Sequence, residues 1–241
     1  MARENENKCL NVIKDAILGK NNINVYSNCS LKEIMDYIFS AVGNANYNDF
    51  PDFVFDGGGI EHFELTSSKE SKKGSEFKIE ESKNKQIREK YEEKIREDFL
   101  NSKHVPDTFS TFTVEETYDS FTYEDFLSSL KRNISNHVDS LIKNHYEDKI
   151  VIFLMEQQTA RMWIDEGMIP IRFYELHRDK RALSIMKDLC NSVKYLIYSA
   201  ADSIEIIDLS KLDSLIDKSV IYKKVMGGRL IDESITILWD L

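Results

Sequence analysis

The chain has 241 residues, of which 41% are apolar and 31% are charged. This apolar share is enough to build a buried core, which excludes a chain that is disordered throughout. The formal net charge is −10, and this acidic balance argues against broad, nonspecific coating of nucleic acid, because such coating needs an overall basic surface. A local basic cleft remains compatible with this charge.

The N-terminal residues and the cysteine spacing indicate the cellular compartment. Residues 1–8 are too polar for a signal peptide, and no run approaches the roughly 18 apolar residues of a membrane span. Cys9, Cys29 and Cys190 are far apart and form no CxxC motif or Cys/His cluster. This spacing argues against a structural zinc site and fits a reducing compartment. We therefore expect a cytoplasmic protein that does not associate with membranes.

Hydrophobic periodicity predicts two helices and then a hairpin in the first quarter of the chain. Helical spacing of apolar residues covers residues 7–18 and again 30–42, where Ser30 and Glu33 have the spacing of a capping box. A short strand follows at 52–56. The three glycines at 57–59 predict a turn that tolerates positive φ, and residues 60–66 predict the return strand.

The next segment differs in composition from the rest of the chain. Residues 67–103 are dense in lysine and glutamate, and a narrow apolar stripe predicts a helix over 79–100. A polar helix of this kind is typical of a solvated or peripheral element. We therefore interpret residues 69–121 as an insertion or arm within a single α/β domain that spans residues 1–241.

The second half of the chain alternates helices and strands. Thr122 caps a strong amphipathic helix that reaches residue 146, and the unbroken apolar run within 149–156 predicts a central strand buried on both faces. The other predicted elements are strands at 109–116, 169–176, 195–198 and 204–208, helices at 180–193 and 211–217, and tail strands at 220–225 and 235–239 joined through Gly227 and Gly228. This order predicts a central mixed sheet flanked by helices.

The hairpin carries the chemically suggestive residues. Strand periodicity places Asp52 on one face of the first strand, and His62, Glu64 and Thr66 on one face of the return strand. If Asp52 pairs near Thr66, the carboxylates of Asp52 and Glu64 lie close together. Two such carboxylates can bind Mg²⁺, which polarises a phosphodiester and lowers the pKa of a bound water.

The segment from Pro51-Asp52 through Glu64-Leu65-Thr66 resembles the PD-(D/E)XK nuclease superfamily, which includes many restriction enzymes and repair nucleases. The resemblance covers roughly residues 30–68 and 122–156. It implies a restriction-endonuclease-like core, with Asp52 and Glu64 as catalytic metal ligands, Mg²⁺ as the cofactor and DNA as the substrate. It also implies that an acid of the preceding helix, here Glu33, joins the metal site, unless Glu33 serves as a helix cap.

The chain departs from the family pattern where the family has its lysine, because that position is Thr66. Threonine cannot supply a positive charge, so Lys73 is the candidate replacement, from a segment that also carries Lys69, Lys72 and Lys78. Two hypotheses follow. One is a Mg²⁺-dependent endonuclease that acts on DNA. The other is a non-catalytic protein on a degenerate nuclease-like scaffold, which binds a protein partner through its acidic surface and the 79–100 helix.

Two further residues have both a functional and a structural interpretation. His62 shares the face of Glu64 and can contact a phosphate or tune the carboxylate, but a lone strand histidine is also a common structural residue. Gln157 follows the central strand, where polar side chains often line a site in α/β sheets, although it can equally belong to a turn. The sequence leaves the oligomeric state open.

Overall fold

The computed structural model describes residues 2–46, 50–65, 76–101, 111–118, 122–157, 161–165, 168–200, 203–222 and 225–234. Within these ranges, no helix has both the length and the apolar character that crossing a bilayer requires.

A seven-stranded mixed sheet forms the centre of the molecule, with the strand order β1-β10-β9-β6-β4-β3-β2. The three middle strands β9, β6 and β4 run parallel to one another, while β3 and β10 are antiparallel to their neighbours β4 and β9. Its strands are β1 (Asn24–Ser27), β2 (Val42–Gly43), β3 (Phe53–Phe55), β4 (Gly58–Glu64), β6 (Ile150–Glu156), β9 (Tyr195–Ala200) and β10 (Ser203–Asp208). The predicted α/β class with a central mixed sheet is confirmed.

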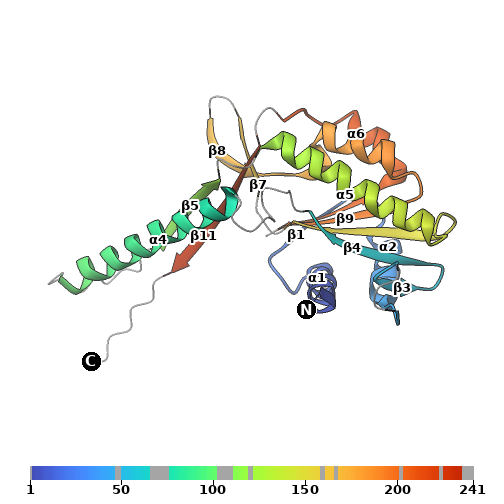
Figure 1. The fold of residues 1–241 in the computed structure, drawn as a ribbon, viewed down its shortest axis with the longest axis horizontal. Helices are drawn as coiled ribbons and strands as arrows, with labels where there is room; N and C mark the ends of the chain where they lie inside the picture. The colour runs from blue at the N-terminus through green and yellow to red at the C-terminus, as the bar shows by residue number, and fades with distance from the viewer. Residues whose placement is uncertain are drawn as a thin grey trace.

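Helices cover both faces of this sheet (Figure 1). The first pair, α1 (Ala2–Ile17) and α2 (Leu31–Ser40), packs on one face and shares a core with Phe53, Ile60 and Ile152. The second pair, α5 (Tyr123–Lys143) and α6 (Lys180–Leu189), packs on the other face. Side chains of one strand therefore alternate between two separate cores, so the parity of a position decides which helices it meets.

Four further strands form a second sheet in the order β5-β11-β7-β8. They are β5 (Thr111–Tyr118), β7 (Arg161–Asp165), β8 (Met168–Phe173) and β11 (Val225–Ser234). The long charged helix α4 (Glu76–Asn101) confirms the predicted helix, and it projects away from the seven-stranded sheet in Figure 1. The segment predicted as an arm thus includes a strand of this second sheet.

Three features of the sequence prediction need correction. The tail does not turn at its glycine pair, because β11 runs through it and places Gly227 opposite Tyr118 and Gly228 opposite Thr117. Val220 makes only an isolated bridge to Asp179, and the predicted strand at 235–239 lies outside the described residues. Strands β1 and β7 were not predicted, because short strands with several polar residues give little periodic signal.

Three smaller elements complete the α6 side of the sheet. The 3₁₀ turn η1 (Leu176–Arg178) leads into α6, whereas η2 (Leu209–Lys211) and the short helix α7 (Leu212–Ile216) follow β10. They bring Leu176, Leu209 and Leu212 into the core beneath α5 and α6.

Candidate functional site

A two-residue turn sets the geometry of the β3–β4 hairpin. Phe55 pairs directly with Gly58, so Asp56 and Gly57 alone make the turn, and Gly57 is the glycine of the three with a positive φ, 82°. Gly58 and Gly59 belong to β4. The predicted turn at 57–59 is therefore wrong at Gly58 and Gly59, which belong to the strand.

Gly59 is needed for close packing rather than for backbone freedom. A Cβ at this position would lie 2.2 Å from Pro51 Cγ and 2.8 Å from the carbonyl oxygen of Phe53. Pro51 is also fixed by Asn44, whose Nδ2 donates to the Pro51 carbonyl at 2.9 Å. These contacts hold the residue just before Asp52, and so they position the Asp52 side chain.

The hairpin register brings Asp52 to Glu61 and not to Glu64. Phe53 is opposite Ile60, so Asp52, one residue earlier, is opposite Glu61. The predicted pairing of Asp52 with Thr66 is wrong by an odd number of residues, and an odd shift turns side chains to the other face. The prediction that Asp52 and Glu64 lie on the same face is therefore wrong.

Asp52 also completes the hydrogen bonding of β4. Its Oδ2 accepts the backbone N–H of His62 at 2.8 Å, at a point where β3 has already ended and supplies no partner. Burial, followed by the charge of Glu61, raises the pKa of Asp52 to about 6, although the bond from His62 acts in the opposite direction. The two carboxylates are thus held together in a partly desolvated place.

The helix α5 closes this face of the site with His137. Its Nδ1 lies 2.8 Å from Glu61 Oε1, and its ring stacks on Phe63 with centroids 4.2 Å apart. One helical turn earlier, Asn133 has a buried Nδ2 with no hydrogen-bond partner among the described residues. Helical spacing places Asn133 and His137 on the same side of α5.

The next residue of β4, His62, points to the opposite face. Its Nε2 lies 3.0 Å from Glu156 Oε2, and Glu64 is the register partner of Glu156 in the parallel pair β4–β6. Cys9 of α1 is buried beside them and feels the charges of Glu156 and Glu64. His62 and Glu64 therefore share a face, as predicted, but they share it with Cys9 and Glu156 instead of with Asp52.

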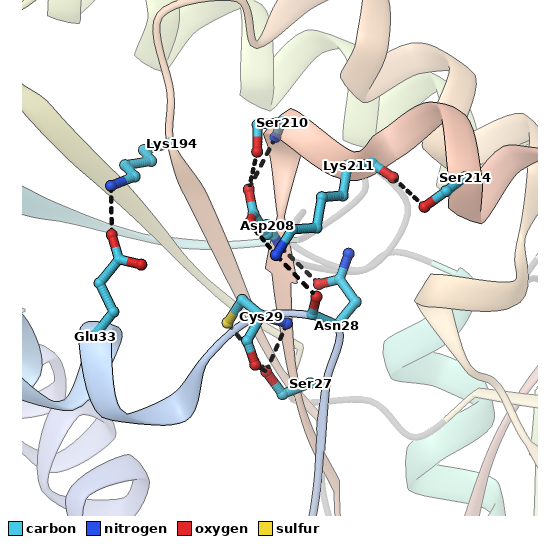
Figure 2. Close-up of polar contacts among 9 residues, drawn as sticks. All are labelled: Ser27, Asn28, Cys29, Glu33, Lys194, Asp208, Ser210, Lys211 and Ser214. Atoms are coloured by element: carbon cyan, nitrogen blue, oxygen red, sulfur yellow. Dashed lines mark hydrogen bonds and ion pairs between the residues drawn. The ribbon is translucent and has the colours of Figure 1, made fainter.

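Glu33 is in neither group. Ser30 is the N-cap of α2 but makes no side-chain capping bond, so the predicted capping box is wrong. Figure 2 shows Glu33 reaching Lys194, whose Nζ lies 2.6 Å from Glu33 Oε1. Because Lys194 directly precedes β9, Glu33 sits at the amino end of the parallel strands, whereas Glu64 and Glu156 lie at their carboxyl ends.

The other predicted site residues have simpler outcomes. Gln157 directly follows Glu156, is 2% exposed, and donates its backbone N–H to the carbonyl of Ser199. Thr66 and Lys73 lie outside the described residues, so the predicted lysine stays a prediction.

Sequence reasoning missed Glu61, His137 and Asn133. One available signal was the dipeptide Asp56-Gly57, which is a strong indicator of a two-residue hairpin turn. Applied to this chain, it gives the observed register and pairs Asp52 with Glu61. The contribution of α5 had no local signal, because His137 and Glu61 are 76 residues apart.

Comparison of the chain with protein-family models, with curated proteins and with solved structures found no match.

Proposed function

We propose that this protein is a metal-dependent phosphodiester hydrolase of the nuclease type, acting on DNA through a site built around Asp52 and Glu61. The observation that carries the proposal is the pairing of these two carboxylates at the end of the hairpin, where burial and mutual charge raise the pKa of Asp52 to about 6. Like charges held together in this way are a frequent mark of a site that a cation completes.

The order of elements around the pair supports the nuclease resemblance. Helix α2 precedes the hairpin strands, α5 crosses over the sheet, and β6 then pairs in parallel with β4. This matches the helix, hairpin, crossover helix and further strand that the resemblance implies. The family's Asp falls on Asp52, whereas its Glu is better matched by Glu61 than by Glu64, because only Glu61 is opposite Asp52.

The donor set suits a hard divalent cation. Asp52 and Glu61 offer carboxylate oxygens, which are the ligands Mg²⁺ prefers. Each carboxylate is oriented by a bond through one oxygen, Asp52 by the His62 N–H and Glu61 by His137. A cation held by this pair would polarise a phosphodiester and lower the pKa of a bound water.

The helix α5 offers two groups that face the same region. His137 is oriented through Nδ1 by Glu61, an arrangement that aligns an imidazole for proton transfer through its other nitrogen. The amide nitrogen of Asn133, which has no partner among the described residues, is a donor suited to a phosphate oxygen. With Glu61 as the family's Glu, the lysine position falls on Phe63 instead of Thr66. Within this proposal, Lys73 remains the candidate for the missing lysine, and His137 is the alternative proton acceptor.

We further propose a cytoplasmic location, because three free cysteines fit a reducing compartment. The competing proposal, a non-catalytic protein that binds a partner on the same scaffold, is retained for the case in which the test below fails. It draws on the net charge of −10 and on the long polar helix α4.

The test is cleavage of plasmid and single-stranded DNA with Mg²⁺ or Mn²⁺, and with a chelator as the blank. Asp52→Asn and Glu61→Gln should each lower the rate by at least about 100-fold, because loss of one group that stabilises transition-state charge costs roughly 10²–10³. Asp56→Asn changes an exposed acid of the same hairpin and should leave the rate unchanged.

Two results would overturn the proposal. One is a wild-type protein without metal-dependent cleavage, and the other is full activity in both Asp52→Asn and Glu61→Gln. Asn133→Leu adds a further check, because removing an unpaired buried donor should leave stability the same or higher while lowering activity. A variant with unchanged activity would show that Asn133 does not contact the substrate.

A further inference from the structure

A cysteine, a histidine and a glutamate meet on the α1 face of the sheet. Cys9 comes from α1, His62 from β4 and Glu156 from the end of β6. One potential ligand atom from each lies within 4.8 Å of the other two, and the His62–Glu156 pair is already at 3.0 Å. Donors roughly 2.0–2.3 Å from a tetrahedral zinc ion are about 3.3–3.8 Å apart, so small side-chain rotations give ligand spacing.

The mixture of donors selects a class of cation. We infer that Cys9, His62 and Glu156 form a binding site for a thiolate-binding divalent cation of the Zn²⁺ type. Thiolate and imidazole suit Zn²⁺, whereas Mg²⁺ takes oxygen ligands. This site is therefore chemically distinct from the carboxylate pair of Asp52 and Glu61, which lies on the other face of the same strand.

Burial and charge at this place support a cation. Cys9 is 5% exposed and the His62 side chain is 6% exposed, so these two donors are largely shielded from water, whereas the Glu156 side chain is 26% exposed. The carboxylates of Glu64 and Glu156, which are register partners in β4 and β6, place negative charge near Cys9. A divalent ion would offset this concentration of negative charge and stabilise the thiolate.

The bound ion would attach α1 to the centre of the sheet. The helix packs through Leu10, Ile13 and Ala16 in the core shared with α2. A metal bond to Cys9 would add a link from this helix to two adjacent central strands, β4 and β6. A bound ion would therefore raise the stability of the chain.

The site was invisible in the sequence because its ligands are close only in space. The spacing of the cysteines argues against zinc if the ligands come from one short motif. His62 and Glu156 are 94 residues apart, and they are neighbours only because β4 and β6 pair in parallel. Cys9 joins them from α1, the first helix of the chain.

The test uses Co²⁺ as a spectroscopic probe for the full-length chain, with Zn²⁺ as the competitor. Wild-type protein should bind one Co²⁺ with the near-ultraviolet band of a thiolate–cobalt bond, and Zn²⁺ should displace it while Mg²⁺ should not. Glu156→Gln should weaken binding by more than about 100-fold, since loss of even an outer partner costs roughly 10–100-fold.

The free cysteines supply matched controls. A Cys29→Ser, Cys190→Ala variant keeps Cys9 as its single thiol and must retain the band, because Cys190 is equally buried but lies in the other core. Cys9→Ala must lose the band. If Cys9→Ala does not fold, the single-thiol variant still decides the matter. A wild type without the band, or a band that vanishes in the single-thiol variant, would overturn the inference.

The result is separable from the proposed nuclease function. Asp52→Asn should lower the rate of DNA cleavage by at least about 100-fold and leave the cobalt band unchanged, since Asp52 is not a ligand of this site. A band that depends on Asp52 would overturn the inference of two distinct sites. A cobalt band in a protein that never cleaves DNA would support the Cys9 site and count against the nuclease proposal alone.

Discussion

Asp179 and Asp52 lie in contrasting environments. Asp179, at the start of α6, is fully buried and accepts hydrogen bonds from the hydroxyls of Tyr123 and Tyr174 and from the backbone N–H groups of Arg181 and Ala182. Asp52, at the hairpin, is only partly buried. It accepts the N–H of His62 and faces a second carboxylate.

The contrast separates a structural acid from a candidate functional one. The charge of Asp179 is spread over four donors, so removing the side chain would leave hydroxyls and a helix end unsatisfied. The charge of Asp52 is repelled by the like charge of Glu61. In the absence of a cation, this repulsion costs the folded state free energy. Local conflicts of this kind are expected at functional sites rather than in cores.

The largest expected effect is on the structural side. Asp179→Ala should lower the free energy of unfolding by about 4 kcal/mol, because it leaves two buried tyrosine hydroxyls without an acceptor, at roughly 1–3 kcal/mol each, and removes an N-cap. Chemical denaturation of the purified protein measures this. Asp213→Ala, which breaks an exposed ion pair with Lys187, should cause no measurable change. A loss below about 1 kcal/mol for Asp179→Ala would contradict the structural assignment.

The second effect tests how the hairpin positions Asp52. Gly59→Ala should lower stability by about 1–3 kcal/mol, because the new methyl group overlaps Pro51 and the Phe53 carbonyl. Gly57→Ala should cost a similar amount, about 1–2 kcal/mol, through its positive φ, with no contact within 4 Å of the added Cβ.

Activity should separate these two glycine variants. Only Gly59→Ala displaces the residue next to Asp52, so DNA cleavage should fall in that variant beyond its fraction unfolded and stay near wild type in Gly57→Ala. Denaturation and cleavage rates measured on the same preparations decide this. Equal losses of activity in both variants would mean that the Pro51 contact does not position Asp52.

The third substitution is expected to raise stability, whereas Asp179→Ala is expected to lower it. In the presence of a chelator at pH 7.5, Asp52→Asn should raise the free energy of unfolding by about 1 kcal/mol, because it removes a charge that the folded state disfavours and keeps an acceptor for the His62 N–H. The folded-state pKa is raised, so the protonated carboxyl favours folding at low pH and this contribution is lost as pH rises through about 6.

The same variant therefore has a pH control. At pH 4 the wild-type carboxyl is largely protonated when folded, so the advantage of Asp52→Asn should disappear there. Denaturation curves at both pH values measure the difference. A variant less stable than wild type at pH 7.5 would place Asp52 with Asp179 among the structural acids.

The long elements of the fold could be predicted from the sequence, because their signals are local and repeated. The apolar run of β6 and the periodic face of α5 gave the central strand and its neighbouring helix. Thr122 also caps α5 as predicted, its Oγ1 accepting the N–H of Asp125. Short polar strands such as β1 gave no such signal, since four residues cannot establish a period.

The candidate site could be predicted only in part, because it depends on register and on distant segments. Asp52 was found from its hairpin, but its partner was misassigned through an odd register shift that the Asp56-Gly57 turn would have prevented. The approach of His137 to Glu61 is set by how α5 crosses the sheet. No local pattern encodes that crossing, and the same holds for the approach of Cys9 to His62.

The smallest expected effect concerns a third carboxylate, that of Glu205. Glu205 is 1% exposed and is satisfied by the backbone N–H groups of Leu176 and His177 and by the His177 ring. The bond with Glu205 raises the pKa of His177, while burial acts against it, and Glu175 raises it and Arg178 lowers it to a lesser extent. The ring also lies 5.6 Å from that of Tyr26.

A raised histidine pKa has a defined consequence for stability. The protonated form favours folding, so this contribution is complete below the unfolded pKa of about 6.5 and is lost as pH rises through the folded value. The stability difference between wild type and His177→Gln should therefore shrink between pH 6 and pH 8, by less than about 1 kcal/mol because the group is half-buried. The titration of the other histidines is the same in both proteins and cancels in this difference. A difference that does not change with pH would therefore mean that Glu205 is satisfied by its backbone donors alone. Asp179 would then be the better example of a fully satisfied structural acid.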